Sequence, residues 1–226
     1  MEDMPSIYII GAQCTGKTTL VEAVSRHIRR ERSHLSFTII KELARGVLVT
    51  ADVNRDDIRA GTEKAMNFQR LVLKTQLDEE QKLQNRGFII SDRSGIDPIA
   101  YANLYGPPQA TTEMLGSSSW AALRKRMCQS IVILSEPVLP WLFDDGVRLM
   151  PEDISEWFAL HNAFISLLQQ SEIKFESLPA TCNVIEKRVA FVLEAWETRA
   201  KQAASVTASA QETRDLSSAA ATTSQL

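Results

Sequence analysis

The sequence predicts an α/β fold, with a parallel sheet that carries helices on both of its faces. The first observation is that short apolar runs alternate with longer segments of helical periodicity, which is the pattern of repeated strand–helix–strand units. The second is that these runs are apolar almost throughout, as expected for strands buried on both faces. With 226 residues, 44% of them hydrophobic, the chain suits one domain of moderate size followed by a tail.

Five apolar runs are expected to form the strands of this sheet. The first, SIYII, precedes a glycine-rich loop, and the segments between the runs are long enough for crossover helices. The strands are predicted at residues 6–10, 36–40, 87–91, 130–135 and 173–179.

Two long helices have recognisable start signals. Thr62 can cap a helix over residues 62–86, with Glu63 in a first turn that favours negative charge. Pro151, followed by two acidic residues, suits the first turn of a helix over 151–170. The buried stripe of this second helix is predicted to be Ile154, Trp157, Phe158, His161, Ile165 and Leu168.

The end of the chain is predicted to combine one more helix with a tail. Asn183 and Glu186 have the spacing of a capping box. Residues 201–226 have almost no large apolar side chain and cannot bury enough surface to offset chain entropy, so we predict a domain over 1–200 and a disordered low-complexity tail. The buried face of the last helix is expected to be Ile185, Val189, Val192, Leu193 and Trp196.

The charge and the cysteines argue against several classes of partner. The formal net charge is −3, whereas nucleic-acid-binding domains are usually basic, so no nucleic-acid partner is expected. The basic run at 26–32 is expected to be a solvated helix face. No apolar run approaches the ~20 residues of a membrane span. The three cysteines are not spaced as metal ligands and fit a reduced, cytoplasmic compartment.

A loop with the spacing G-x-x-x-x-G-K-T lies between the first strand and a helical run. Gly11 and Gly16 let the backbone turn tightly and approach phosphate oxygens, and successive N–H groups at a helix N-terminus can bind those oxygens. Lys17 is expected to reach the β- and γ-phosphates, and the hydroxyl of Thr18 to ligand Mg²⁺. The predicted nucleotide-binding residues are Gly11, Ala12, Gln13, Cys14, Thr15, Gly16, Lys17, Thr18 and Thr19.

Residues just after the strands are further candidates, because ligands bind at the carboxyl ends of the strands in an open parallel sheet. Asp92 is expected to hold Mg²⁺ or to accept a substrate proton; alternatively, it caps the next helix. Glu42 is a candidate general base acting on a hydroxyl. Its alternative is an ion pair with Arg45 or Lys17 that orders the site.

Two arginines complete the predicted catalytic set. Arg93 can clamp a phosphate with both arms of its guanidinium group. The segment at about 137–153 is predicted to be a lid loop, and Arg148 in it to close on the γ-phosphate. A surface pair of Arg148 with Asp144 or Asp145 is the alternative.

Three weaker expectations concern the surroundings of this site. Asp97 is predicted to cap a helix that starts at Pro98. Gln69 either hydrogen-bonds a base or sugar of a ligand or is an ordinary solvated glutamine. An adenine ring is expected near the loop at residues 179–181.

Together these motifs resemble the P-loop AAA-domain family related to the ribosylnicotinamide kinase domain of NadR, near the thymidylate and deoxynucleoside kinases. The resemblance rests on GAQCTGKTT, KELAR, NFQ, DRSGIDPIAYA, DGVRL and EKRVAFVLEAW, and it spans roughly residues 6–199. It implies a P-loop NTPase three-layer sandwich with a five-stranded parallel sheet in the order 2-3-1-4-5. It also implies a nucleoside triphosphate with Mg²⁺ and, often, phosphoryl transfer to a small molecule, although some relatives are described as GTP- and lipid-binding regulators. A ring-forming, protein-remodelling activity is not expected.

Three functions remain to be weighed: a small-molecule kinase, a nucleotide-dependent hydrolase and a nucleotide-sensing regulator. In this wider group, hydrolysing ATPases usually place a water-activating Glu after the metal-binding Asp, where this chain has Arg93, a residue better suited to binding phosphate. The guanine-reading motif N-K-x-D is absent, so a Ras-like switch is not expected. We therefore predict transfer of the γ-phosphoryl group of ATP, with GTP as the alternative, and with Mg²⁺, to an unidentified small-molecule acceptor.

Overall fold

The structure is a computed structural model that describes residues 4–84, 86–143 and 149–223, with side chains described up to residue 205. Its centre is a five-stranded sheet in which every pairing is parallel and the strand order is β2-β3-β1-β4-β5. This order and the α/β class confirm the sequence-based prediction. The strands are β1 (Ile7–Ile10), β2 (Phe37–Ile40), β3 (Phe88–Asp92), β4 (Ile131–Ser135) and β5 (Glu176–Leu178).

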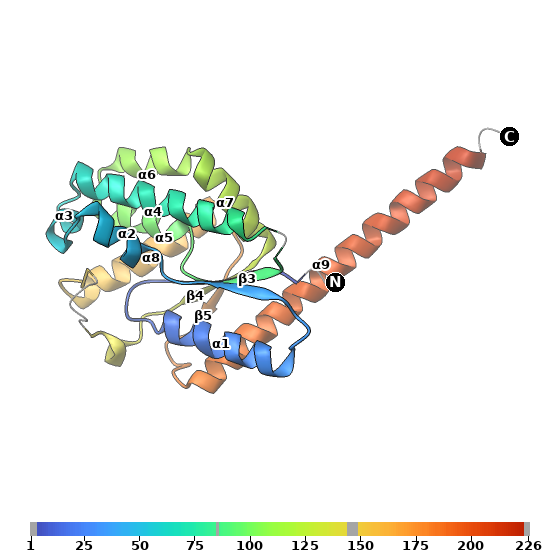
Figure 1. The fold of residues 1–226 in the computed structure, drawn as a ribbon, viewed down its shortest axis with the longest axis horizontal. Helices are drawn as coiled ribbons and strands as arrows, with labels where there is room; N and C mark the ends of the chain where they lie inside the picture. Colours follow the sequence, from blue (N-terminus) through green and yellow to red (C-terminus); the bar gives the residue numbers. More distant parts are fainter. Residues whose placement is uncertain (1–3, 85, 144–148, 224–226) are drawn as a thin grey trace.

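Helices cover both faces of the sheet (Figure 1). On one face lie α1 (Lys17–Glu31) and the first part of α9 (Ile185–Thr223). The other face carries α4 (Glu63–Lys82), α5 (Ile96–Tyr105) and α8 (Ile154–Gln170). The remaining short helices are α2 (Ala44–Ala51), α3 (Arg55–Arg59), α6 (Pro108–Leu115), α7 (Ser118–Gln129) and a 3₁₀ turn, η1 (Leu139–Trp141).

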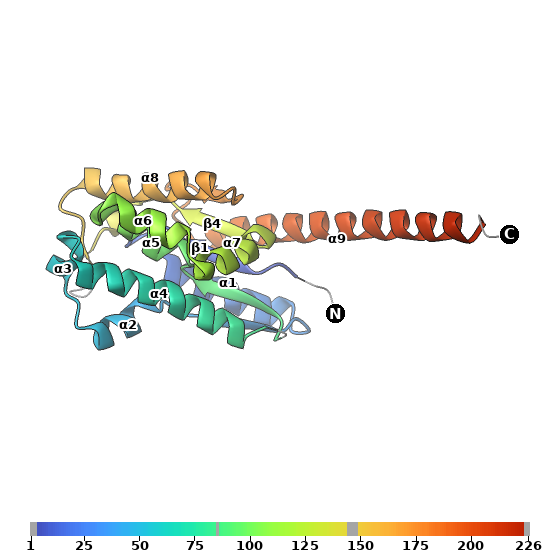
Figure 2. The same ribbon diagram turned by 90° about the horizontal axis from the view of Figure 1, so that it is seen from above.

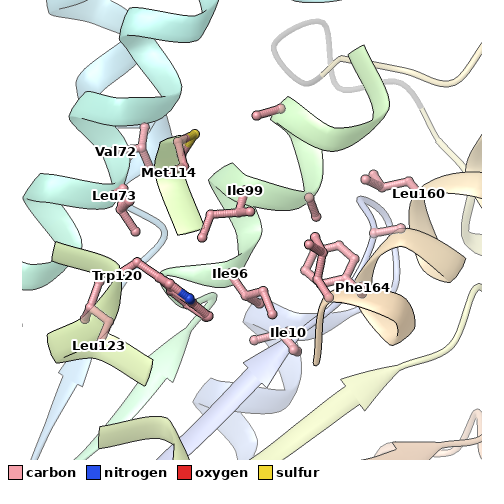
Figure 3. Packing of buried hydrophobic residues seen from close by; sticks show 14 of the residues in the cluster. Ile10, Val72, Leu73, Ile96, Ile99, Met114, Trp120, Leu123, Leu160 and Phe164 are labelled. Carbon is pink, nitrogen blue, oxygen red and sulfur yellow. The ribbon is translucent and has the colours of Figure 1, made fainter. Parts of the chain in front are cut away.

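The central strand divides its side chains between two hydrophobic cores, because successive residues of a strand point to opposite faces. Ile7 and Ile9 belong to the core beneath α1 and α9, whereas Tyr8 and Ile10 belong to the larger core beneath α4, α5, α7 and α8. Figure 3 shows part of this larger core, with Ile10 close to residues from several of those helices. Burial on both faces explains why the strands read as continuous apolar runs in the sequence.

Several predicted helix starts differ from the structure. Thr62 does cap α4, since its hydroxyl accepts a hydrogen bond from the amide of Ala65 at 3.1 Å. However, α8 begins at Ile154 with Asp153 as its cap, so Pro151 precedes the helix rather than opening it. The last helix begins at Ile185, so its cap position is Val184 and the predicted cap, Asn183, lies one residue too early. The shift in each case follows the hydrogen bond that the cap side chain or backbone actually makes, which spacing alone does not fix.

Two members of the predicted α8 stripe also face outwards. Trp157, His161 and Leu168 are buried as expected, whereas Ile154 is 53% exposed and Phe158 is 40% exposed. The buried face of α8 is instead completed by Leu160, Ala163, Phe164 and Leu167. For α9 the prediction is better, because Val189, Val192 and Trp196 are all buried.

The predicted disordered tail is helical in the structure. Helix α9 runs without a break from Ile185 to Thr223, and Figures 1 and 2 show its second half projecting away from the sheet and the other helices. Alanine is frequent in this segment and favours helix even without packing. The helical conformation of this segment does not test where the packed domain ends, so the predicted boundary near residue 200 stays a prediction.

Candidate functional site

The phosphate loop lies at the carboxyl end of the central strand. Because β1 lies between β3 and β4, residues that follow these three strands meet at one edge of the sheet. Gly11 has φ = 131°, and a Cβ atom there would approach the carbonyl oxygen of Ser135 to 2.7 Å. Gly16 has φ = 74°, and its Cβ would meet the ring of Trp141 at 2.8 Å. Both glycines are therefore required by backbone geometry and by the closeness of their neighbours.

Lys17 opens helix α1 and is only 5% exposed. Its ammonium group donates hydrogen bonds to the carbonyl oxygen of Ala12 and, at 3.3 Å, to the hydroxyl of Thr15. Burial, reinforced by the positive charge of Arg93, lowers the pKa of Lys17 to about 7, although nearby carboxylates, Asp92 first, act in the opposite direction. The loop thus holds a lysine whose positive charge is poorly compensated without a further anion.

Thr18 and Asp92 form the candidate metal site. The hydroxyl of Thr18 donates to Oδ2 of Asp92 at 2.5 Å, and the buried Oδ1 of Asp92 has no hydrogen-bond partner among the described residues. A hydroxyl beside an unpartnered carboxylate oxygen fits Mg²⁺, which prefers oxygen ligands and usually completes its shell with water and phosphate. Asp92 is the last residue of β3 and α5 begins at Ile96 after Gly95, so Asp92 does not cap that helix.

Glu42 and Arg93 meet in a buried charge network. Arg93 Nε donates to Glu42 Oε1 at 2.8 Å, and Arg93 Nη1 donates to Asp97 Oδ1 at 3.1 Å. Glu42 also pairs with Arg45 Nε at 3.0 Å, so the alternative ion pair predicted for Glu42 is present. Burial opposes the charge of Arg93, but the acidic groups around it, Glu42 first, outweigh burial and hold its pKa well above the usual value.

This network bears on two of the sequence-based predictions. Nε and Nη1 of Arg93 are paired with carboxylates, and a phosphate contact by this residue stays a prediction. Asp97 lies inside α5, which begins at Ile96, so it does not cap a helix at Pro98. Its carboxylate instead accepts from Arg93 and, at 2.7 Å, from the amide of Ser94. Burial raises the pKa of Asp97, while Arg93 and Lys17 act against that rise.

A pocket opens beside this network, between α2, α4 and α5. Gln69 is part of its wall and is only 3% exposed, so the expectation of an ordinary solvated glutamine is wrong. Its amide has no hydrogen-bond partner among the described residues. The pocket is lined by Glu42, Arg45, Gln69, Gln76, Arg93, Asp97 and Tyr101, together with apolar side chains such as Leu43, Leu48, Ile58, Phe68, Val72 and Leu149.

A second hollow is lined in part by the phosphate loop itself. It is lined by Cys14, Gly16, Thr19, Trp141, Phe143, Asn183, Ile185 and Arg188. It shares the lining residue Asn183 with a further hollow, which is lined by Ala180 and Thr181 from the loop predicted to receive an adenine ring. The amide of Ala180 donates to Glu136 at 2.9 Å, which ties that loop to the end of β4.

Sequence reasoning missed the contacts that four residues make around the phosphate loop. Trp157 Nε1 donates to the carbonyl oxygen of Gln13 at 2.9 Å, and the hydroxyl of Tyr101 donates to the side-chain oxygen of Gln13 at 3.3 Å. Arg188 donates to the carbonyl oxygen of Thr15 at 3.0 Å and stacks on Trp141. These residues come from α5, η1, α8 and α9, so only the tertiary fold brings them together.

Arg148 and its possible partners Asp144 and Asp145 lie outside the described residues. The predicted lid at 137–153 is therefore seen only in part, as η1 with its flanking residues up to Phe143 and the chain from Leu149 onwards. Among the helices of the described ranges, none is both long enough and apolar enough to cross a membrane.

Comparisons with known proteins agree with this architecture. A deoxyadenosine kinase from M. mycoides superposes with a TM-score of 0.58 at 14% identity, covering 85% of this chain and 99% of the kinase. NadR in complex with NR gives a TM-score of 0.63 at 20% identity, covering 88% of this chain, which spans 52% of the NadR chain. At these identities the likeness concerns the fold. No curated protein matches the chain.

The family of the chain is shown by a family model, since the likeness to solved structures concerns only the fold. The model described as "AAA domain" matches residues 6–188, which include the phosphate loop, all five strands and Arg188. The chain therefore belongs to this AAA-domain family and is a P-loop nucleotide-binding domain.

Proposed function

We propose that the protein is a kinase that transfers the γ-phosphoryl group of a nucleoside triphosphate to the hydroxyl of a small, uncharged acceptor. The observation that carries this proposal is the presence of two separate hollows, one lined by the phosphate loop and the other by residues that follow β2 and β3. A transferase needs a site for the nucleotide and another for the acceptor, whereas a hydrolase needs only water beside the phosphate. The kinases among the structures of similar fold support the same choice.

The hollow around Thr19, Trp141 and Ile185 is the proposed site of the nucleotide base. It adjoins Gly16 at the start of α1, where the phosphate chain would enter the loop. The amides of the loop and Lys17 would then hold the phosphates. The negative charge of the phosphates would stabilise the protonated form of Lys17, which burial disfavours. Either ATP or GTP fits this description.

The pocket between α2, α4 and α5 is the proposed acceptor site. Its charged side chains balance, with Glu42 and Asp97 against Arg45 and Arg93, and most of its remaining wall is apolar. Such a wall favours a neutral acceptor over a phosphomonoester. The unpartnered amide of Gln69 can both donate and accept a hydrogen bond, which suits the polar edge of a flat ring.

Glu42 is the proposed general base. Arg93 and Arg45 hold its two carboxylate oxygens, which fixes the orientation of the carboxylate towards the pocket. A base fixed in this way can take the proton of an acceptor hydroxyl as the oxygen attacks the γ-phosphorus. Thr18 and Asp92 would hold Mg²⁺, which supplies charge neutralisation on the transferring phosphoryl group.

The buried ion pairs of Arg93 also bear on the alternative of a hydrolase. The position after Asp92, where a water-activating Glu would be expected, holds an arginine bound to two carboxylates. Arginine stays protonated and cannot act as a base on water. Slow hydrolysis without an acceptor is therefore part of the proposal.

The test is a search for a phosphorylated product by mass spectrometry. The protein is incubated with Mg²⁺, ATP or GTP and a library of nucleosides and other neutral hydroxyl compounds. We expect one acceptor class to give product, and Gln69→Met to raise the KM for that acceptor. Gln81→Met is the matched control, because Gln81 lies on the exposed face of the same helix. Rapid hydrolysis with no product would refute the kinase. Tight nucleotide binding with neither reaction would favour a nucleotide-sensing regulator.

A further inference from the structure

A buried arginine from the last helix reaches the phosphate loop near the start of the chain. Arg188 lies in the first turn of α9 and is 2% exposed. Its Nη2 donates to the carbonyl oxygen of Thr15 at 3.0 Å and to the hydroxyl of Ser135 at 3.3 Å. The guanidinium group also lies 4.8 Å from the ring centroid of Trp141, which covers it.

The hydrogen bond to Thr15 fixes the direction of the next amide. The carbonyl of Thr15 and the N–H of Gly16 belong to one planar trans peptide, and in such a peptide the two groups point in opposite directions. By holding the carbonyl oxygen, Arg188 turns the Gly16 N–H towards the opposite side of the loop. Amides in this part of a phosphate loop are the donors that hold phosphate oxygens.

The charge of Arg188 is not balanced within the described part of the chain. Its Nε and Nη1 are buried without hydrogen-bond partners, and no carboxylate of the described residues pairs with it. Lys17 and Arg93, in contrast, both lie close to Asp92, Asp97 and Glu42. A buried and unpaired cation is costly, and the aromatic ring of Trp141 compensates only part of that cost. An anion bound in the phosphate loop would compensate the remaining charge.

We propose that Arg188 is a nucleotide-positioning residue, whose charge is balanced by the polyphosphate in the loop and whose hydrogen bond to Thr15 turns the Gly16 amide towards that polyphosphate. The inference rests on the nucleotide-binding half of the proposed function and does not depend on what happens to the γ-phosphate. The competing explanation is purely structural: Arg188 would only fasten α9 to the sheet.

The two explanations differ in what a substitution does to phosphate binding. We would measure the affinity for inorganic tripolyphosphate and for ATP, each with Mg²⁺, by titration calorimetry. Arg188→Met should weaken both by about tenfold or more, because it removes a charge and a loop contact. Arg188→Lys keeps the charge and should recover most of this loss. Arg199→Met is the matched control, since Arg199 lies on the same helix and donates at 2.8 Å to a carbonyl oxygen far from the loop, that of Cys128.

The unliganded melting temperature provides a second readout. A structural anchor predicts a lower melting temperature for Arg188→Met with unchanged affinity for tripolyphosphate, and that result would overturn the inference. If the Met variant does not fold, the comparison of Arg188→Lys with Arg188→Gln tests the inference, because Gln keeps a hydrogen-bond donor for the carbonyl of Thr15 but lacks the positive charge. Equal affinity of these two variants for tripolyphosphate would also overturn it.

The outcome is separable from that of the kinase proposal. Wild-type protein that binds tripolyphosphate in an Arg188-dependent way, but forms no product, would leave this inference standing and refute the kinase. Wild-type protein that binds neither tripolyphosphate nor ATP would refute both.

Discussion

At the scale of single residues, the site is organised by charges that are buried close together. Lys17 and Arg93 share a small volume with Asp92, Asp97 and Glu42, and each charge alters the protonation equilibria of its neighbours. Of these residues, Lys17 bears the clearest consequence for solution behaviour. Its pKa of about 7 lies far below the ordinary value of 10.5 because burial disfavours the ammonium form.

This shift predicts that the free protein becomes more stable between about pH 7 and pH 10. In that interval Lys17 is largely neutral in the folded state and protonated in the unfolded state, so the unfolded state binds more protons and stability rises with pH. The slope contributed by one group is at most about 1.4 kcal/mol per pH unit. Lys17→Met should remove this contribution, and denaturant unfolding of both proteins across the interval measures it. Parallel stability curves for the two proteins would show that Lys17 is not perturbed.

Mutations should distinguish the roles of the two carboxylates at the strand ends, Glu42 and Asp92. Glu42→Gln should keep nucleotide affinity and lower kcat by about 10²-fold or more, the scale of general base catalysis. Asp92→Asn should in addition raise the Mg²⁺ concentration needed for half-maximal activity, because Asp92 carries the unpartnered oxygen beside Thr18. Steady-state kinetics over a magnesium series makes the comparison. An unchanged magnesium dependence in Asp92→Asn would argue against the metal assignment.

At the scale of elements, α9 has two parts with different environments. Its first part is packed: Trp196 is fully buried, its ring lies tilted against that of Phe88 with 5.1 Å between the centroids, and its indole N–H donates to the carbonyl oxygen of Pro5 at 2.7 Å. Lys201 and the four residues after it are exposed, and the helix beyond them points away from the domain (Figure 2). The contacts of Trp196 that fasten α9 to the domain therefore lie before residue 200.

Removal of residues 201–226 should leave the melting temperature and the nucleotide affinity unchanged. The contrasting variant ends at residue 193 and so loses Trp196, for which a cost of about 3–5 kcal/mol is expected from buried tryptophan truncations. Thermal unfolding of the two truncated proteins against the full chain is the measurement. A drop of several degrees on removing only 201–226 would show that the end of the helix packs against the domain.

At the scale of the whole molecule, the fold forms two separate hollows. The proposed nucleotide site is lined by residues of the phosphate loop, α1, η1 and α9, and the proposed acceptor site by residues of α2, α4 and α5. The two hollows share no lining residue, and in the proposed reaction the two ligands would meet at the phosphate loop.

This arrangement predicts that nucleotide consumption depends on the acceptor. Hydrolysis without acceptor should be slow, because the position directly after Asp92 holds Arg93 and not a carboxylate that could activate water. The right acceptor should raise nucleotide consumption by orders of magnitude. Measurement of ADP formation with and without each acceptor tests this. Consumption that does not change with any acceptor, together with rapid hydrolysis, would be incompatible with the proposed transferase. Arg148 stays a predicted lid residue in this scheme.

The sequence by itself determined the fold class, the five strands and the phosphate loop. These features are local: apolar runs mark strands buried on both faces, and the glycine positions of the loop reflect backbone conformations that only those positions need. It also placed Glu42, Asp92 and Arg93 at one edge of the sheet, because the ends of neighbouring parallel strands must meet there.

Only the tertiary structure decided what these residues contact. Arg93 forms ion pairs with Glu42 and Asp97, and Gln69 is buried in a pocket wall. Arg188 reaches Thr15 across 173 positions of the chain. Contacts of this kind depend on how helices from distant segments pack on the sheet, and no local propensity or spacing records that packing. The strands and the loop could be predicted because their physics is local, whereas the pairing of buried charges is settled by the fold as a whole.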